Sequence, residues 1–121
     1  MSKNENRVLT ELEKKTLMNI GKNVKYTRRD LLNVTLATLS KNTGVSRDVI
    51  CRLEALSQGV KPETTYPSIT TMIKFCEGVG VLPSELFDSE FEQEAEIQNK
   101  ILEHCKDFRS EDKDIVSLDN D

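Results

Sequence analysis

Apolar residues recur every three or four positions through residues 1–87, a spacing that predicts consecutive amphipathic helices rather than strands. The first predicted helix covers residues 11–29. Thr10 and Glu13 form a capping-box pattern at its start, because each of these side chains can accept a hydrogen bond from the other residue's amide. Residues 33–34 form a short connection to the next segment. The sequence therefore predicts an all-α protein.

Two short helices are predicted on either side of a tight turn. Thr35 is the expected N-cap of the first and Ser46 that of the second, since both residue types accept backbone hydrogen bonds at that position. Gly44 is expected to end the first helix, where a left-handed backbone is needed, and Gly59 to end the second. The apolar stripe of the second helix consists of Val49, Ile50, Leu53 and Leu56.

A fourth helix is expected to begin at Pro67, since proline is favoured in the first turn of a helix. Glycines at positions 78 and 80 end it, and a fifth short helix over residues 83–87 closes the core. Residues 1–87 are therefore predicted to form one five-helix domain. The expected apolar face of the fourth helix consists of Ile69, Met72, Ile73 and Cys76, with Phe75 beside them.

Residues 88–108 differ, because their apolar positions repeat at near-heptad spacing among many glutamates. We predict one long amphipathic helix here, followed by a flexible acidic tail over residues 109–121. The apolar stripe of this helix either forms a dimer interface or folds back on its own domain. We favour the dimer, because a domain already closed at residue 87 needs no further helix. The stripe consists of Phe91, Ala95, Ile101, Leu102, Cys105 and Phe108.

The net charge of −4 conceals two halves of opposite sign. Residues 1–87 carry 13 Lys and Arg against 9 Asp and Glu, whereas residues 88–121 carry 4 against 12. A basic half suits a polyanion such as nucleic acid, although charges also simply solvate helical surfaces. For the acidic half, the sharper hypotheses are that it competes with DNA for the basic surface or contacts a protein partner.

The residues most used in catalysis are scarce, and we expect no enzyme. His104 is the single histidine, which excludes most histidine-based catalytic sites. The cysteines, Cys51, Cys76 and Cys105, have no CxxC spacing, so neither a disulfide framework nor a metal site is predicted, and no cofactor is expected. The chain has no apolar run long enough for a membrane span and no signal-peptide pattern, which makes the cytoplasm the expected compartment.

The segment from Thr35 to Glu54, TLATLSKNTGVSRDVICRLE, predicts a helix-turn-helix. Its second helix can enter the major groove of DNA, which is about 12 Å wide. The side of this helix opposite its apolar stripe is expected to point outward. That side carries Arg47, Asp48, Cys51 and Arg52.

From about Ile20 to Phe87 the chain resembles the Cro and phage-repressor type of helix-turn-helix regulators, the XRE family. The resemblance implies a five-helix repressor-type domain and a transcriptional regulator, in particular a repressor, that binds a palindromic operator in double-stranded DNA as a homodimer. The chain departs from the family at Leu36, where a polar residue is usual, and at Asp48, which repels phosphates. The matching segments are IGKNVKYTRR, T-x-x-x-L-S-x-x-T-G-V-S, VICRLE and PSITTMIKFCEGVGVLPSELF.

The resemblance and the residue chemistry together suggest individual roles. Arg47 and Arg52 suit guanine or phosphate, Asp48 suits cytosine, and Cys51 suits a thymine methyl group. Each also has a plainer interpretation, as an exposed charge or a small buried side chain. In similar proteins the residues matching Arg28 and Glu54 form a structural ion pair. Phosphate contacts are expected from Thr35, Lys41, Asn42, Ser46 and Lys61.

A different function remains open, in which the same helices form a protein-interaction module with little DNA binding, as in some antitoxins or phage-encoded inhibitors. Leu36, Asp48 and the negative net charge favour it, and fold alone does not decide between the two. Titration against DNA at two salt concentrations separates them, because regulator binding depends steeply on salt.

Overall fold

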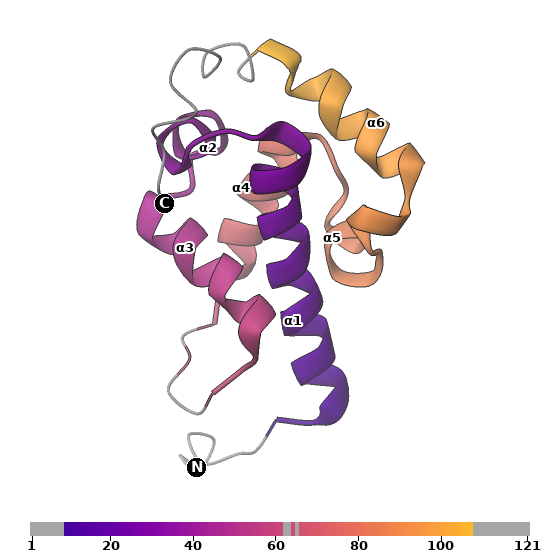
Figure 1. Cartoon of the computed structure of the whole chain (residues 1–121). Coiled ribbons are helices and arrows are strands. Elements are labelled where there is room, and N and C mark those ends of the chain that lie inside the picture. Colours follow the sequence, from indigo (N-terminus) through magenta and orange to yellow (C-terminus); the bar gives the residue numbers. More distant parts are fainter. Residues whose placement is uncertain (1–8, 62–63, 65, 108–121) are drawn as a thin grey trace.

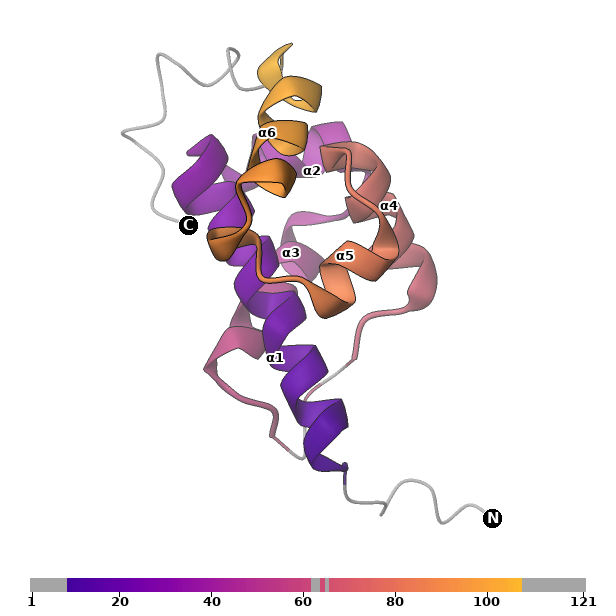
Figure 2. The ribbon, with the colours of Figure 1, turned by 90° about the vertical axis from the view of Figure 1, so that its right-hand side faces the viewer.

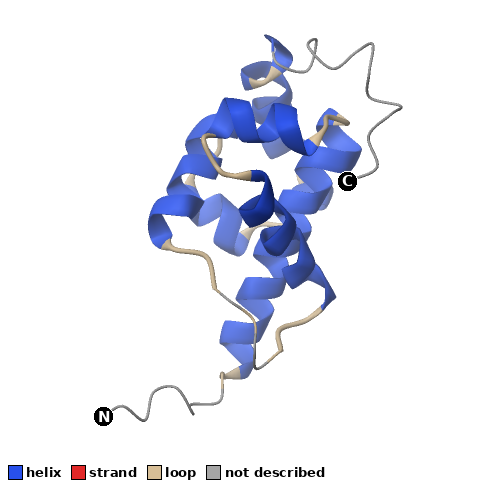
Figure 3. Cartoon of the chain, turned by 90° about the vertical axis from the view of Figure 1, so that its left-hand side faces the viewer, coloured by secondary structure: helices blue, strands red, loops and turns tan. Residues whose placement is uncertain are grey.

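The computed structural model describes residues 9–61, 64 and 66–107. The regular elements of these residues are all helices, joined by short loops, and none is a strand (Figure 3), which confirms the predicted all-α class for this part of the chain. The expected tail over residues 109–121 lies outside them. The elements, in chain order, are α1 (Glu11–Lys25), the π-helix η2 (Tyr26–Leu32), α2 (Leu36–Thr43), α3 (Arg47–Ala55), the 3-10 helix η3 (Leu56–Gln58), α4 (Ile69–Val79), α5 (Pro83–Asp88), the 3-10 helix η4 (Phe91–Gln93) and α6 (Ala95–His104).

Side-chain caps set the helix starts where the sequence places them. The Thr10 hydroxyl accepts from the Glu13 amide at 3.0 Å, and the Glu13 carboxylate accepts from the Thr10 amide at 2.9 Å. Thr35 caps α2 by accepting from an amide three residues on at 3.0 Å, and Ser46 caps α3 in the same way at 3.2 Å. Gly44 ends α2 with a φ of 80°. The predicted starts of both helices and the end of α2 are confirmed. The second helix ends earlier than expected, because α3 stops at Ala55 and the 3-10 helix η3 continues from there to Gly59.

The first helix begins as predicted but ends differently. α1 stops at Lys25, and the chain continues as the π-helix η2 up to Asn33, which has a left-handed φ of 55°. A π-helix has more residues per turn than an α-helix, so the buried positions move around the axis. In η2 the buried residues are Thr27, Arg28 and Leu32.

The fourth helix buries only part of the face expected: Cys76 is buried and Met72 partly buried, as predicted, whereas Ile69 and Ile73 are exposed. α4 begins at Ile69 after an N-cap at Ser68, not at Pro67. Its buried residues include Phe75 and Val79, whereas Ile69 is 66% exposed. Two apolar stripes exist on this helix, and the stripe that carries the bulky Phe75 side chain is the one that enters the core. The other stripe, at Ile69 and Ile73, faces outward.

The segment after α5 folds back onto the chain as a 3-10 turn and a ten-residue helix, not as one long helix. This corrects the expected dimer interface, because Phe91, Ile101 and Cys105 are each 0% exposed and belong to the chain's own core. Side chains buried in this way are not available to a second copy. Of the other stripe residues, Ala95 is exposed, Leu102 is partly buried, and Phe108 lies outside the described residues.

Two asparagines of α1 hold this segment in place. The Asn23 amide group donates to the carbonyls of Leu86 and Ser89 at 3.0 and 2.8 Å, and its Oδ1 accepts from the Phe91 amide at 3.0 Å. Asn19 donates to the carbonyls of Phe87 and Ser89 at 3.1 and 2.9 Å. These bonds satisfy backbone groups that the short turns leave unpaired, and they place α5, η4 and α6 on the opposite side of α1 from α3 (Figures 1 and 2).

None of the helices in the described ranges combines the length and the apolar character that crossing a bilayer requires.

Candidate nucleic-acid interface

The α2–α3 pair is held rigidly by its turn. Val45, in the middle of the turn, is 3% exposed, and Leu39 and Ile50 on the flanking helices are fully buried. The Thr43 hydroxyl donates to the Leu39 carbonyl at 2.8 Å and accepts from the Val45 amide at 3.2 Å. A buried side chain and a fixed hydroxyl therefore set the angle at which α3 leaves the turn.

The outer side of α3 carries the polar residues expected there. Arg47, Asp48, Cys51 and Arg52 are all exposed, whereas Ile50 and Leu53 on the other side are buried. α3 lies along one edge of the molecule, with no described helix covering its outer side (Figure 1). The helix thus presents two guanidinium groups, one carboxylate and one thiol on a single exposed surface.

Arg52, in the last turn of α3, lines two grooves. One groove, of about 190 Å³, separates α3 from the start of α4. The other, of about 380 Å³, runs along the end of α3 and contains both Arg52 and Lys61 among its lining residues. The structure therefore brings these two candidate cations to one groove, although they are nine positions apart in sequence.

The remaining candidate residues border α2. The hydroxyl oxygens of Thr35 and Ser46 accept the capping bonds described above, so each sits at a helix N-terminus, where backbone amides favour an anion. Asn42 is partly buried, and its side-chain amide donates to the Thr38 carbonyl at 2.9 Å. Lys41 is exposed. Asn42 is therefore the candidate least available to a phosphate.

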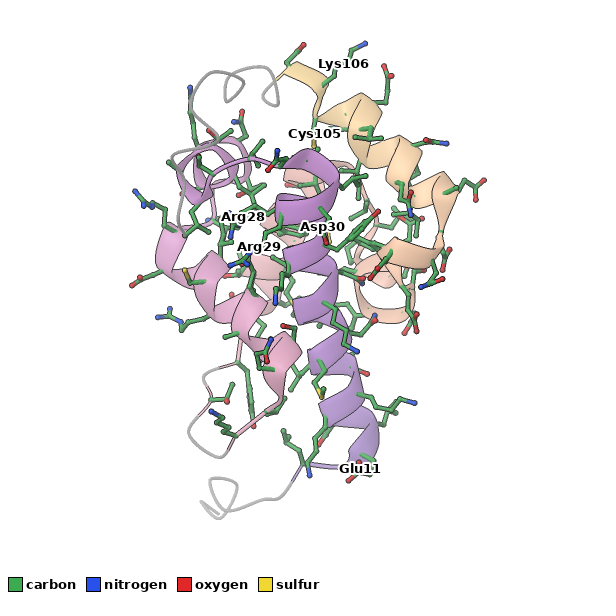
Figure 4. All side chains as sticks on the ribbon, viewed as in Figure 1. Glu11, Arg28, Arg29, Asp30, Cys105 and Lys106 are labelled. Atoms are coloured by element: carbon green, nitrogen blue, oxygen red, sulfur yellow. The ribbon has the colours of Figure 1, made fainter. Side chains whose placement is uncertain are left out.

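Arg28 and Glu54 form the expected ion pair beneath α3. The Arg28 Nε lies 2.6 Å from Glu54 Oε2, and its Nη2 lies 3.1 Å from Oε1, so the pairing is bidentate. The Arg28 side chain is 4% exposed and that of Glu54 8%, and Arg28 Nη1 also donates to the Val34 carbonyl at 3.2 Å. Figure 4 shows Arg28 and Arg29 reaching from η2 toward α3. The pair joins the end of the first helical region to the end of α3.

Sequence reasoning missed the residues that complete this surface. Arg29 is 46% exposed, and its Nε lies 3.5 Å from Glu54 Oε1. Tyr66 is 48% exposed and lines the groove beside Arg52. The sequence contained a signal for each residue. Arg29 directly follows Arg28, and Tyr66 is an aromatic residue before a proline in a polar loop.

The acidic residues of the C-terminal segment do not face α3. Residues 88, 90, 92, 94 and 96 are all acidic and exposed, and they belong to α5, η4, α6 and their connections. Those elements lie on the other side of α1 from α3 (Figure 2). Glu92 and Asp30 add to the effect of burial in raising the pKa of Tyr26, which places both carboxylates near this phenol. The negative charge of residues 88–96 is therefore kept away from the outer side of α3.

The residues that the structure describes contain no group of three or more His, Cys, Asp or Glu side chains that could hold a metal ion. Burial, followed by the charge of Glu85, raises the pKa of Cys76 to about 11, so this thiol stays protonated at neutral pH. Cys51 is the exposed cysteine, and Cys105 is buried.

Comparisons with protein-family models, with curated proteins and with solved structures gave no match to this chain.

Proposed function

We propose that this protein is a sequence-specific DNA-binding regulator of transcription whose α2–α3 pair acts as a helix-turn-helix. α3 enters the major groove, which accepts an α-helix. The observation that carries the proposal is the exposed side of α3, where Arg47 and Arg52 stand beside Asp48 and Cys51 on a helix fixed from below by the Arg28–Glu54 pair. The sequence resemblance to Cro-type repressors points the same way.

Within this function the residues divide into two groups. Arg47 and Arg52 donate to guanine or to phosphate, and Asp48 accepts from the cytosine amino group. The N-termini of α2 and α3, with Lys41 and Lys61, contact phosphates and supply affinity without sequence information. We propose that the regulator is a repressor and that two copies bind a palindromic operator, with half-sites about one helical turn apart.

The two copies do not join through the apolar stripe of residues 91–105. Phe91, Ile101 and Cys105 are buried in the core of each copy. A dimer on DNA therefore uses another surface, and the operator's symmetry fixes the relation between the copies.

The test is binding to the DNA upstream of the protein's own gene at two salt concentrations. Affinity falls steeply as salt rises if several phosphates are contacted, with a slope of about −0.9 per phosphate. Arg52→Ala should lower the affinity about tenfold or more while leaving the melting temperature unchanged, because its side chain is exposed. Lys22→Ala, which removes the same charge on the other side of α1, is the matched control and should bind as the unaltered protein does.

A second candidate function is the binding of a protein partner by the same helices. The carboxylate of Asp48, exposed on the outer side of α3, favours it, because a carboxylate repels phosphates. If the protein shows no salt-dependent affinity for any duplex offered, this second function replaces the first.

A further inference from the structure

The groove between α3 and the start of α4 has a character that DNA does not explain. Its lining combines four apolar or aromatic residues with two hydroxyl residues, and Arg52 is its single charged member among the described residues. The apolar or aromatic residues are Val49, Leu53, Tyr66 and Pro67, and the hydroxyl residues are Ser68 and Thr71. Tyr66 is 48% exposed and the neighbouring Ile69 66%. Exposed apolar groups gathered around one cation are typical of a surface that binds a peptide.

The size of the groove also argues against a small molecule. Its volume is about 190 Å³, whereas pockets for drug-sized ligands start at about 300 Å³. A groove of this size accepts one or two side chains of an extended segment. The exposed apolar surface continues beyond it along α4, where Ile73 lies one turn after Ile69 and is 40% exposed.

The described chain ends just after α6, and α6 brings this end close to the C-terminus of α4. The Cys105 thiol lies 3.7 Å from the Val79 carbonyl, at the C-terminus of α4. Gly80, which ends α4, packs so closely on His104 that a Cβ there would lie 2.6 Å from the His104 Cβ. The described end of α6 therefore lies at the C-terminal end of α4, while the groove lies at the N-terminal end of α4.

The segment that follows has matching chemistry. Residues 108–121 contain two cations and five carboxylates, and their apolar side chains after Phe108 are the cluster Ile115, Val116 and Leu118. Aliphatic side chains fit the apolar lining, and the acidic neighbours Asp112 and Asp114 are complementary to Arg52.

The distance is compatible with the length of the segment. α4 has 11 residues and is about 16 Å long at 1.5 Å per residue. The seven residues 108–114 span up to about 23 Å when extended. They reach from one end of α4 to the other and leave residues 115–118 at the groove.

We propose that the groove lined by Val49, Arg52, Leu53, Tyr66 and Pro67 is a docking site for residues 112–118 of the same chain. The aliphatic cluster fills the groove, and Asp112 and Asp114 face Arg52. Because Arg52 also belongs to the proposed DNA-binding surface, the docked segment competes with DNA; this last step rests on the proposed function. A segment docked about nine-tenths of the time lowers the apparent DNA affinity about tenfold.

The docking itself is tested in the full chain by amide NMR spectra, which require no DNA. Changing Ile115, Val116 and Leu118 together to serine should shift the resonances of residues 49–53 and 66–71. The control, Ser117→Ala with Asn120→Ser, alters the same segment without touching its charge or apolar cluster and should leave them in place. Tyr66→Ser should reciprocally shift residues 112–118. Unshifted groove resonances in the triple variant would overturn the proposal.

Dilution and DNA titration separate the remaining outcomes. If the resonance shifts caused by the triple variant are independent of protein concentration, they support docking within one chain. If they vanish on dilution, the segment docks on a second copy, and the proposal of docking within one chain is overturned. The triple variant should bind upstream DNA about tenfold more tightly than the control. Equal DNA affinity of the two, despite shifted groove resonances, overturns the competition alone. No DNA binding by either overturns the proposed function and leaves the docking supported by the spectra.

Discussion

Arg28 and Glu54 illustrate what a single buried pair contributes to this molecule. Both side chains are almost fully buried, and the pair joins η2 to the end of α3 by two charge-assisted hydrogen bonds. The resemblance to repressors was enough to pair these two residues from sequence. It gave no sign of Arg29, which reaches the same carboxylate at 3.5 Å from a half-exposed position.

Arg28→Ala should lower the free energy of unfolding by about 3–5 kcal/mol, because it leaves the Glu54 carboxylate buried without its main partner. Urea denaturation followed by circular dichroism measures the change. Arg29→Ala removes the same charge from the same carboxylate at an exposed position, so it should cost less than about 1 kcal/mol. Equal losses of unfolding free energy in the two variants would show that the contribution of the Arg28–Glu54 pair does not depend on the burial of Arg28.

Gly21 is a second residue whose role only the structure reveals. A Cβ at this position would lie 2.5 Å from the Ser57 amide nitrogen and 2.8 Å from the Leu53 carbonyl oxygen. Both are backbone atoms, which cannot move aside as a flexible side chain does. The glycine therefore allows α1 to cross the end of α3 at close range.

Gly21→Ala should lower the free energy of unfolding by about 1–3 kcal/mol, because the added methyl group forces the two helices apart. This loss opposes the higher helix propensity of alanine, which is worth about 1 kcal/mol. Thermal melting of the variant measures the net effect. Lys22→Ala, at the exposed neighbouring position, is the control for placing alanine in this part of α1 without a new backbone contact. A rise in melting temperature for Gly21→Ala would mean that the crossing is looser than described.

At the scale of elements, the sequence predicted the helix ends, because these depend on interactions between residues close in the chain. Thr10, Thr35, Ser46 and Gly44 mark helix ends through bonds to residues within four positions, and the structure places all four as predicted. The face of α4 was not predictable in this way. Its two apolar stripes have the same helical spacing, and only packing against the other helices selects the one with Phe75.

The C-terminal segment was misjudged for a related physical reason. A near-heptad apolar stripe has the same pattern whether it packs on a second copy or on its own domain. What decides the matter is the set of hydrogen bonds from Asn19 and Asn23 to residues 86–91, which are distant in sequence. Asparagines on the inner face of a predicted helix were the available signal.

Asn23→Ala should lower the free energy of unfolding by about 2–4 kcal/mol, because it removes the side-chain partner of the buried Phe91 amide and of the Leu86 carbonyl, whereas the Ser89 carbonyl keeps its bond from Asn19. Hydrogen exchange should accelerate more in α6 than in α3, since the lost bonds hold the C-terminal segment. Mass spectrometry of the exchanging protein resolves the two regions. Asn99→Ala, at an exposed position of α6, is the control. Equal acceleration of hydrogen exchange in both helices would contradict the view that the Asn23 bonds hold the C-terminal segment alone.

At the scale of the whole molecule, one core serves two surfaces of opposite charge. The exposed arginines of α3 lie on one side of α1, and the exposed carboxylates of residues 88–96 lie on the other. The sequence indicated this division through its charge balance, but it gave no spatial relation between the halves. That relation depends on α6 folding back, which buries Ile97, Ile101 and Cys105 in the same core as Ile20 and Leu39.

The three cysteines report on this arrangement, because one is on α3 and two are in the core. At pH 8, Cys51 should react rapidly with iodoacetamide, whereas Cys76 and Cys105 should react only through unfolding. The raised pKa of Cys76, about 11, further reduces its thiolate fraction. As the pH rises from the ordinary thiol pKa toward that value, the unfolded state ionises first, so the protein should lose stability in alkaline solution.

Peptide mass spectrometry gives the labelling rate of each cysteine. Cys51→Ser should remove the fast phase and leave the two slow ones, and upstream DNA should slow the labelling of Cys51 alone. Rapid labelling of Cys105 with slow labelling of Cys76 would mean that α6 is not packed on the core, since Cys105 is the C-cap of that helix. The charge division would then lose its structural basis, because the acidic residues of α6 would no longer be fixed on the side of α1 away from α3.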